Sequence, residues 1–202
     1  MKTEIEAKFL NVDHHTIRRR LESLGATLEQ PMRLMRRVII ETPELKAKGG
    51  FVRIRDEGHK VSLTYKQFDE LSITGAKELE VTVSDFDETI KLFAAAGLTH
   101  GSFQESMRET WKYGDTEVVL DVWPWLNPYI EIEAASEQEV ESTAEALGLE
   151  WGSAVFGDVM TAYKHQYPHL GEHDTVGNLT RVAFDDDLPD LFIPSTSPTR
   201  KH

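Results

Sequence analysis

The sequence predicts an α+β fold in which an eight-stranded antiparallel β-barrel closes into a tunnel and helices pack outside it. Charged and apolar residues alternate with a period of two through most of the first two thirds of the chain, which is typical of strands with two unlike faces. Short turn signals such as Glu57-Gly58 and Gly114-Asp115 separate several of these segments and indicate antiparallel hairpins. Helical spacing of apolar residues interrupts the strands and predicts amphipathic helices on the outside.

Eight segments carry the strand pattern. In chain order they cover residues 2–10, 35–41, 51–56, 60–67, 76–84, 104–113, 116–123 and 128–134. Eight antiparallel strands are enough to close a sheet on itself, and closure removes the exposed edges that would otherwise pair with other chains.

Helices are expected over residues 13–25, 85–97 and 136–148. Each of these segments starts at a residue that can cap a helix, continues with apolar residues three and four positions apart, and ends at a glycine. A shorter helix is expected over residues 158–165.

The sequence predicts one domain over residues 1–167 and a C-terminal tail over residues 168–202. The tail is rich in Pro, Asp, Ser and Thr and contains the acidic run 185–187. Such a composition indicates a loosely ordered segment.

Composition restricts the environment and the partners. The chain has no cysteine, so it forms neither disulfides nor thiolate metal sites, which fits a reducing compartment. Because the first residues are charged and no apolar run approaches about 18 residues, we expect neither a signal peptide nor a membrane span, and a cytoplasmic location. A net charge of -13 disfavours binding to nucleic acid or anionic membranes, although a pocket can still hold a small anion. The oligomeric state stays open, a homodimer included.

The charged faces of the strands form a set. Glu4, Glu6 and Lys8 share one face of the first strand, because successive side chains point to opposite sides. Taken alone, such a face is typical of a sheet with one side in water. The set is more specific, since three strands carry a Glu-x-Glu pair and others carry Arg-x-Arg or a lone cation. The further members are Arg53 and Arg55, Lys66, Glu78 and Glu80, Arg108, Asp121, and Glu131 and Glu133.

Repeated carboxylate pairs point to a metal. Carboxylates at positions i and i+2 stand roughly 6.5 to 7 Å apart on one strand face. Several such pairs repel one another unless a cation lies between them. Oxygen ligands without His or Cys suit Mg²⁺ or Mn²⁺, which keep several waters and bridge to phosphate oxygens. Arg and Lys on other strands suit the same phosphates, so the sequence predicts a polyphosphate site with metal inside the barrel.

Taken in order, these motifs resemble the CYTH domain, the family of class IV adenylate cyclases and thiamine triphosphatases, also called triphosphate tunnel metalloenzymes. Glu4-Ile5-Glu6-Ala7-Lys8 corresponds to the Glu-x-Glu-x-Lys hallmark of that family. The resemblance spans residues 2–165 and continues through Phe51-Val52-Arg53-Ile54-Arg55, Thr64-Tyr65-Lys66, Lys77-Glu78-Leu79-Glu80, Arg108, Asp121 and Tyr129-Ile130-Glu131-Ile132-Glu133.

The resemblance implies a role for each position. Lys8, Arg53, Arg55, Lys66 and Arg108 are expected to bind a triphosphate, and Glu4, Glu6, Glu131 and Glu133 to hold Mg²⁺ or Mn²⁺. The expected catalytic residues are Lys66, Glu6 and Glu133. Glu78, Glu80 and Asp121 are expected to orient the basic residues or to hold water on a second metal.

The second strand departs from the family pattern. The family often has Asp-x-Tyr-Phe-Asp-Thr-Pro there, whereas this chain has Arg37-Val38-Ile39-Ile40-Glu41-Thr42-Pro43. Because that wall shapes the pocket, the departure bears on which substrate is bound.

The expected activity is metal-dependent hydrolysis of a triphosphate, with inorganic tripolyphosphate, thiamine triphosphate and nucleoside triphosphates all open as substrates. Lys66 is expected to stabilise or protonate the leaving oxygen, since a lysine among other cations can titrate low. One alternative is a class IV cyclase that makes cyclic AMP and pyrophosphate from ATP. Another is a noncatalytic polyphosphate-binding module. Trp123 and Trp125 are expected to be packing residues, and the alternative is that one of them lies at the tunnel rim and stacks on a base or a thiazole-type ring.

Overall fold

Eight strands of the chain close into a ring. The computed structural model describes residues 2–68, 72–74 and 76–194. Backbone hydrogen bonds join the strands in the order β2-β3-β4-β5-β1-β8-β7-β6, and a further pairing of β2 with β6 completes the circle. Every pair within the ring is antiparallel, as the sequence predicts. A short ninth strand, β9 (Arg181–Val182), pairs in parallel with β6, so the whole sheet is mixed.

The eight strands of the ring correspond to the predicted segments. They are β1 (Lys2–Leu10), β2 (Thr27–Ile40), β3 (Gly50–Asp56), β4 (Val61–Phe68), β5 (Ala76–Val83), β6 (Ser102–Tyr113), β7 (Thr116–Val122) and β8 (Tyr129–Ala134). The largest difference is β2, which begins at Thr27, whereas the sequence predicts a start at residue 35. Register shifts between Leu28 and Arg33 interrupt the alternation there, so the pattern hides the first half of this strand.

Five α-helices accompany the ring. They are α1 (His14–Ser23), α2 (Pro43–Lys46), α3 (Phe86–Ala95), α4 (Glu137–Ala146) and α5 (Val159–Gln166). Asp13, Asp85 and Ser136 accept hydrogen bonds from the first turns of α1, α3 and α4, as their sequence positions predict. Of these five, the single-turn α2 was not expected. Among the described residues, no helix is long and apolar enough to cross a membrane.

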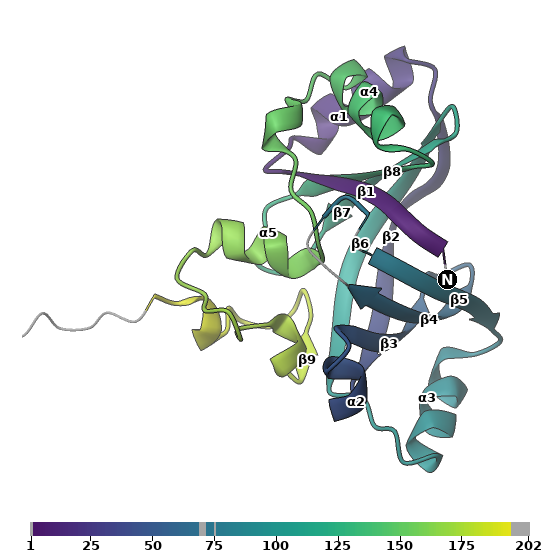
Figure 1. The fold of residues 1–202 in the computed structure, drawn as a ribbon, viewed down its shortest axis with the longest axis vertical. Helices are drawn as coiled ribbons and strands as arrows, with labels where there is room; N and C mark the ends of the chain where they lie inside the picture. Colours follow the sequence, from purple (N-terminus) through teal and green to yellow (C-terminus); the bar gives the residue numbers. More distant parts are fainter. Residues whose placement is uncertain (1, 69–71, 75, 195–202) are drawn as a thin grey trace, which may run out of the picture.

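The helices cover the outer face of the ring and thereby determine which side chains point inward. Figure 1 shows α1 and α4 at one end of the molecule, over β1 and β8, and α3 at the opposite end. Ala7 and Phe9 of β1 are buried in a cluster with Ile17 of α1 and Val140 of α4. Because successive residues of a strand face opposite sides, this burial turns Glu6 and Lys8 into the ring. The alternative of an ordinary solvated face therefore does not apply to β1.

The C-terminal segment packs against the ring over its described part. It contains the short 3₁₀ helices η2 (Val176–Asn178) and η3 (Asp190–Phe192), and another, η1 (Trp151–Ser153), precedes α5. Val182 and Phe192 are buried in a cluster with Trp123 and Tyr163. Of these apolar residues, Val182 and Phe192 belong to the segment that the sequence predicts as a tail from residue 168. The rest of the predicted tail, 195–202, lies outside the described residues.

Candidate active site

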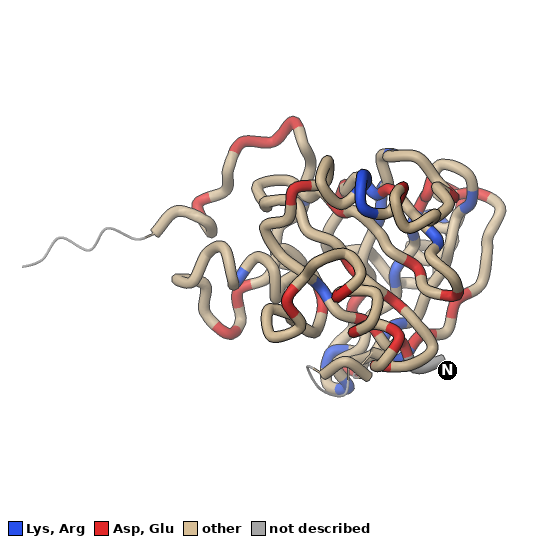
Figure 2. Tube along the Cα trace, turned by 90° about the horizontal axis from the view of Figure 1, so that it is seen from above, with Lys and Arg blue, Asp and Glu red and all other residues tan. Residues whose placement is uncertain are grey.

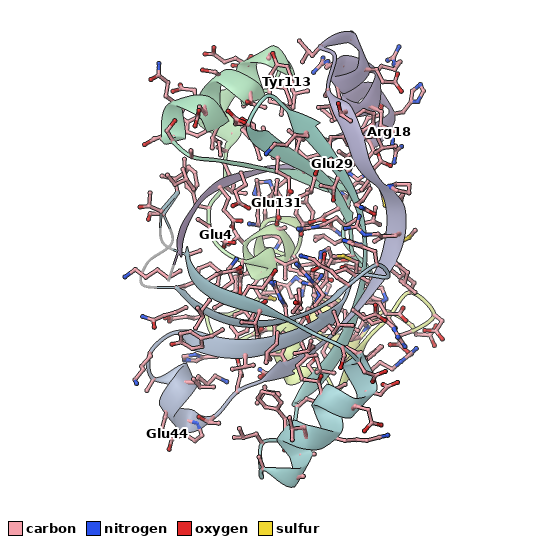
Figure 3. The ribbon with its side chains drawn as sticks, turned by 90° about the vertical axis from the view of Figure 1, so that its right-hand side faces the viewer. Glu4, Arg18, Glu29, Glu44, Tyr113 and Glu131 are labelled. Atoms are coloured by element: carbon pink, nitrogen blue, oxygen red, sulfur yellow. The ribbon has the colours of Figure 1, made fainter. Side chains whose placement is uncertain are left out.

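The ring encloses a cavity of about 810 Å³. Side chains from all eight ring strands line it, together with residues from the start of α5 and from η2. In Figure 3, Glu4 and Glu131 lie inside the ring, whereas Arg18 and Glu44 lie outside it. The predicted site residues among the lining are Glu4, Glu6, Lys8, Arg53, Arg55, Lys66, Glu78, Glu80, Arg108, Glu131 and Glu133. The remaining one, Asp121, is buried behind Arg108, to which it is hydrogen-bonded at 2.7 Å.

The charges of the ring divide into two contiguous halves. We call β6, β2, β3 and β4 the basic half, because they supply Arg108, Arg33, Arg37, Arg53, Arg55 and Lys66. We call β5, β1, β8 and β7 the acidic half, because they supply Glu78, Glu80, Glu4, Glu6, Glu131, Glu133, Glu117 and Asp121. Two exceptions are Lys8, a cation within the acidic half, and Glu29 of β2, a carboxylate within the basic half. Figure 2 shows the acidic and basic positions distributed along the folded chain.

A row of carboxylates crosses the acidic half. Glu6 of β1 stands directly opposite Glu133 of β8, and Glu133 stands opposite Glu117 of β7. Burial, together with Glu133 and Glu29, raises the pKa of Glu117 above its ordinary value. The sequence placed Glu117 on the same face as Asp121 but assigned it no role in the site.

Lys8 and Arg108 link three carboxylates of the acidic half. Lys8 Nζ lies 2.9 Å from Glu6 Oε1 and 3.2 Å from Glu131 Oε1. Arg108 Nη2 lies 2.8 Å from Glu131 Oε2 and also binds Asp121. Burial favours the uncharged form of Glu131, but Lys8 and Arg108 outweigh it and hold the pKa of Glu131 far below its ordinary value. Glu131 is therefore a carboxylate at neutral pH.

Lys66 bridges two carboxylates of the acidic half. Its Nζ lies 2.7 Å from Glu4 Oε2 and 3.1 Å from Glu78 Oε1. Burial would lower the pKa of Lys66, but Glu6, Glu78 and Glu4 raise it above its ordinary value. The expectation that Lys66 titrates low is therefore wrong, because its nearest charged neighbours are carboxylates. The side chain stays an ammonium ion.

Glu4 shares a hydrogen bond with Glu78. Burial and the adjacent carboxylates Glu78 and Glu6 raise the pKa of Glu4 to about 7, although Lys66 opposes the shift. Burial also disfavours the charged form of Glu78, but Arg53 and Lys66 hold the pKa of Glu78 below its ordinary value. Glu4 is thus the member of the pair that takes up a proton.

Glu57 neutralises part of the basic half and was not predicted as a site residue. Arg55 donates from Nε and Nη2 to Glu57 Oε1 at 3.0 and 2.8 Å, and Ser62 Oγ donates to the same oxygen at 3.2 Å. Arg53 lies 3.7 Å from Glu78 and 3.4 Å from Thr64 Oγ1. Thr64 in turn donates to Glu80, which fits the expected orienting role of that carboxylate.

The donor set fits a hard divalent cation. Glu4, Glu6, Glu131 and Glu133 lie on the neighbouring strands β1 and β8, face one cavity, and offer only oxygen. Within the described ranges, no three acidic or histidine side chains converge closely enough to hold an ion as they stand. Glu4, Glu6 and Glu131 instead bind Lys66, Lys8 and Arg108. The carboxylates could therefore hold Mg²⁺ or Mn²⁺ after turning away from these cations.

One end of the cavity is closed by α5 and η2. Asp158, Val159 and Thr175 are among the residues that line it there. In Figure 3, α5 lies across the end of the ring that is remote from the viewer. Asp158 caps α5 by accepting a hydrogen bond from Met160 N at 2.9 Å, and burial raises the pKa of its carboxyl group.

The two tryptophans considered for base stacking are engaged otherwise. Trp123 lines the closed end, but Arg37 Cζ stands 4.5 Å from the centre of its ring. Trp125 packs against Phe192 with ring centres 5.7 Å apart, and its Nε1 donates to the carbonyl of Asp186. Arg37 was not predicted as a site residue, since two adjacent arginines in β2 hide which of them points inward.

Comparison with solved structures finds the same fold in other proteins. A Pyrococcus horikoshii protein is 24% identical, with a TM-score of 0.64, over 75% of this chain and 93% of its own. A Vibrio parahaemolyticus adenylate cyclase candidate is 12% identical, with a TM-score of 0.70, over 81% and 98%. A Hippeastrum adenylyl cyclase candidate, described as having a dominant triphosphatase activity, is 14% identical, with a TM-score of 0.54, over 81% and 96%. At these identities the similarity shows the fold alone.

Sequence comparison identifies the family. A search of curated proteins finds no match. The family profile described as the CYTH domain matches residues 2–154, which is most of the chain and includes every strand of the ring. The resemblance seen in the ordered charged motifs is thereby confirmed, and the chain belongs to the CYTH domain family.

Proposed function

We propose that this chain hydrolyses the terminal phosphoanhydride bond of a small triphosphate, with Mg²⁺ or Mn²⁺ bound to the acidic half. The observation that carries the proposal is the pair of complementary walls around one cavity. Arg53, Arg55 and Lys66 come from one contiguous set of strands, and Glu4, Glu6 and Glu133 come from the other. A noncatalytic anion-binding pocket needs only the first wall.

The basic half would hold the phosphates. Arginine offers forked hydrogen bonds that match two phosphate oxygens, and lysine offers a compact charge. Burial and Arg55 lower the pKa of Arg53 to about 10, which still leaves it charged at neutral pH. Lys66 also stays charged, so its proposed role is to neutralise the leaving oxygen and not to protonate it.

The acidic half would hold the cation through Glu4, Glu6, Glu131 and Glu133. When bound there, a divalent cation neutralises phosphate oxygens and lowers the pKa of a water molecule. Glu6 and Glu131 now bind Lys8, and Glu131 also binds Arg108. If these carboxylates turn to a metal ion, Lys8 and Arg108 become available to the phosphates. Metal and triphosphate are therefore expected to assist each other's binding.

The reaction itself requires little covalent chemistry from the protein. The oxygen of a water molecule bonds to the terminal phosphorus while the bond from phosphorus to the bridging oxygen breaks, which releases orthophosphate and leaves a diphosphate. The side chains position the chain of phosphates and stabilise the charge that develops on it. The protein walls of the cavity strengthen each of these interactions relative to bulk water, because the effective dielectric constant is lower there.

The experiment is a substrate panel with matched variants. Phosphate release is measured from tripolyphosphate, thiamine triphosphate and ATP, in EDTA, in Mg²⁺ and in Mn²⁺. The wild type is expected to release phosphate only with a metal ion, and Glu6→Gln and Lys66→Ala are expected to lose at least about 100-fold in rate. Glu44→Gln, on the outside of the ring, is the control and should match the wild type.

The products separate the proposal from its rivals. Cyclic AMP and pyrophosphate from ATP would indicate the cyclase reaction, for which the same family gives precedent. Tight binding of every triphosphate without turnover in Mg²⁺ or Mn²⁺ would indicate a binding module. Wild-type rates in Glu6→Gln would contradict the assignment of metal binding to the acidic half.

A further inference from the structure

Arg37 occupies an unusual place at the closed end of the cavity. It lies on β2 with its side chain inside the ring, and it is 7% exposed. Its guanidinium stacks on Trp123, and its Nη2 donates to Ser106 Oγ at 2.6 Å. Trp123 belongs to the buried cluster that α5 and η2 complete, which places Arg37 beside the segment that closes the tunnel.

Arg37 lacks the carboxylate partner that the other cations have. Each other Lys or Arg of the cavity lining has a carboxylate oxygen within 3.9 Å. The described part of the chain supplies none to Arg37, and it leaves Arg37 Nε without any hydrogen-bond acceptor. Asp121, which is close enough to affect the pKa of Arg37, binds Arg108. A buried charge without a counterion is costly, so this site favours an anion.

The neighbours of Arg37 strengthen that preference. Arg37 stands directly opposite Arg55 of β3 and opposite Gln104 of β6. Burial, followed by the neighbouring Arg55, Arg53 and Arg108, lowers the pKa of Arg37 well below its ordinary value. The ring of Trp123 attracts a cation but does not neutralise it.

We propose that Arg37, held in place by Trp123 and Ser106, forms an anion subsite at the closed end of the tunnel and binds the phosphate group that lies deepest. That the anion is a phosphate of the substrate rests on the proposed function. This subsite is ready without a metal ion, because no carboxylate among the described residues has to be released from Arg37 first. The other cations of the cavity become fully available only when their carboxylates turn away. In the metal-free protein, Arg37 is therefore the residue that anchors a triphosphate.

The experiment measures the binding of tripolyphosphate in EDTA, where no metal-dependent turnover occurs. Calorimetric titrations at one fixed ionic strength compare the wild type, Arg37→Gln and Arg36→Gln. Arg36 is the matched control, because it is the preceding residue of β2 but pairs with Asp56 on the exposed side. Arg37→Gln is expected to weaken binding at least about tenfold, since a hydrogen-bonded charge is removed. Arg36→Gln is expected to bind as the wild type does.

Two further readouts distinguish binding from a merely structural role. Arg37→Gln should melt at the same temperature as the wild type or higher in the absence of anion, because an unpaired buried charge is removed. Tripolyphosphate should change the tryptophan emission of the wild type, and Trp123→Phe should lose that change. Should Arg37→Gln fail to fold, Arg37→Lys tests the same point, because it keeps the charge but loses the fork and should bind at an intermediate affinity.

The outcomes separate this inference from the proposed function. Equal affinity of Arg37→Gln and the wild type in EDTA would overturn the subsite, even if the enzyme releases phosphate with Mg²⁺. A loss that is equal in Arg36→Gln and Arg37→Gln would also overturn it, since it would reflect only overall charge. Weakened binding in Arg37→Gln without any metal-dependent turnover in the wild type would support the subsite and contradict the hydrolase.

Discussion

The basic and acidic halves of the ring use the same alternating strand pattern but satisfy their charges differently. In the basic half, Arg55 and Arg108 have carboxylates at hydrogen-bond distance, and Arg53 lies 3.7 Å from one. In the acidic half, Glu6, Glu133 and Glu117 stand opposite one another across three strands. Like charges in direct opposition destabilise a sheet. The fold thus pairs most cations of the basic half with carboxylates, whereas in the acidic half it brings carboxylates of three strands into one row, of which Glu6 also binds Lys8.

The largest effect on stability is expected where a buried arginine and a buried carboxylate are most tightly paired. Arg108→Met leaves Asp121, with a side chain only 1% exposed, without its arginine. Because an uncompensated buried charge remains, the free energy of unfolding should fall by about 3 kcal/mol, as measured with urea. The exposed pair of Arg36 with Asp56 provides the control, and Arg36→Gln should lose less than about 0.5 kcal/mol. Equal losses in both variants would contradict the compensation of the basic half's cations by buried carboxylates of the chain.

The protonation of Glu4 provides a second test of how the acidic half differs from the basic half. Without metal, the folded protein keeps a proton on Glu4 up to a pKa of about 7, whereas the unfolded chain loses it at the ordinary value of 4.5. The folded state thus binds more protons within this window, and the free energy of unfolding in EDTA should fall as the pH rises through it. Glu4→Gln should show a smaller fall over the same range. An unchanged pH profile in this variant would place the titration elsewhere.

The smallest expected effect concerns Glu117. Replacing it by Gln removes one carboxylate from the row opposite Glu133, so Glu117→Gln should raise the free energy of unfolding in EDTA by about 0.5 kcal/mol. The gain should shrink in saturating Mg²⁺, because the wild type then has a cation in the acidic half. A decrease in stability in EDTA would show that Glu117 is already compensated.

The direction of a side chain can be predicted from the sequence where charged and apolar residues alternate regularly. In β1, Ala7 and Phe9 mark the outer face, so the inward direction of Glu6 and Lys8 follows from the alternation alone. The adjacent Arg36 and Arg37 of β2 offered no such signal, since each face of that strand carries one arginine. Glu57 was hidden in another way, because it follows the strand end and appears in the sequence as part of a turn.

The packing of the segment that closes the tunnel could not be predicted from the sequence, and here the reason is different. Val176, Val182 and Phe192 are buried, but they are spaced irregularly among Pro, Asp and Gly, and so they show neither strand nor helix periodicity. Their burial depends on Trp123 and Tyr163, which lie far away in the sequence. Asp158 was likewise predicted as part of a helix start, whereas its position at the cavity follows from where α5 docks.

The most direct test of the roles proposed for the two halves uses a single sample, which is measured before and after metal is added. Wild-type protein in EDTA is mixed with tripolyphosphate, binding is recorded, and Mg²⁺ in excess over EDTA and phosphate is then added while orthophosphate is followed. We expect binding without phosphate release in EDTA and sustained release after Mg²⁺. Phosphate release in EDTA would contradict the proposed roles of the two halves, in which the basic half binds phosphate and the acidic half binds the metal ion. The absence of release after Mg²⁺ from every triphosphate of the panel would contradict them too.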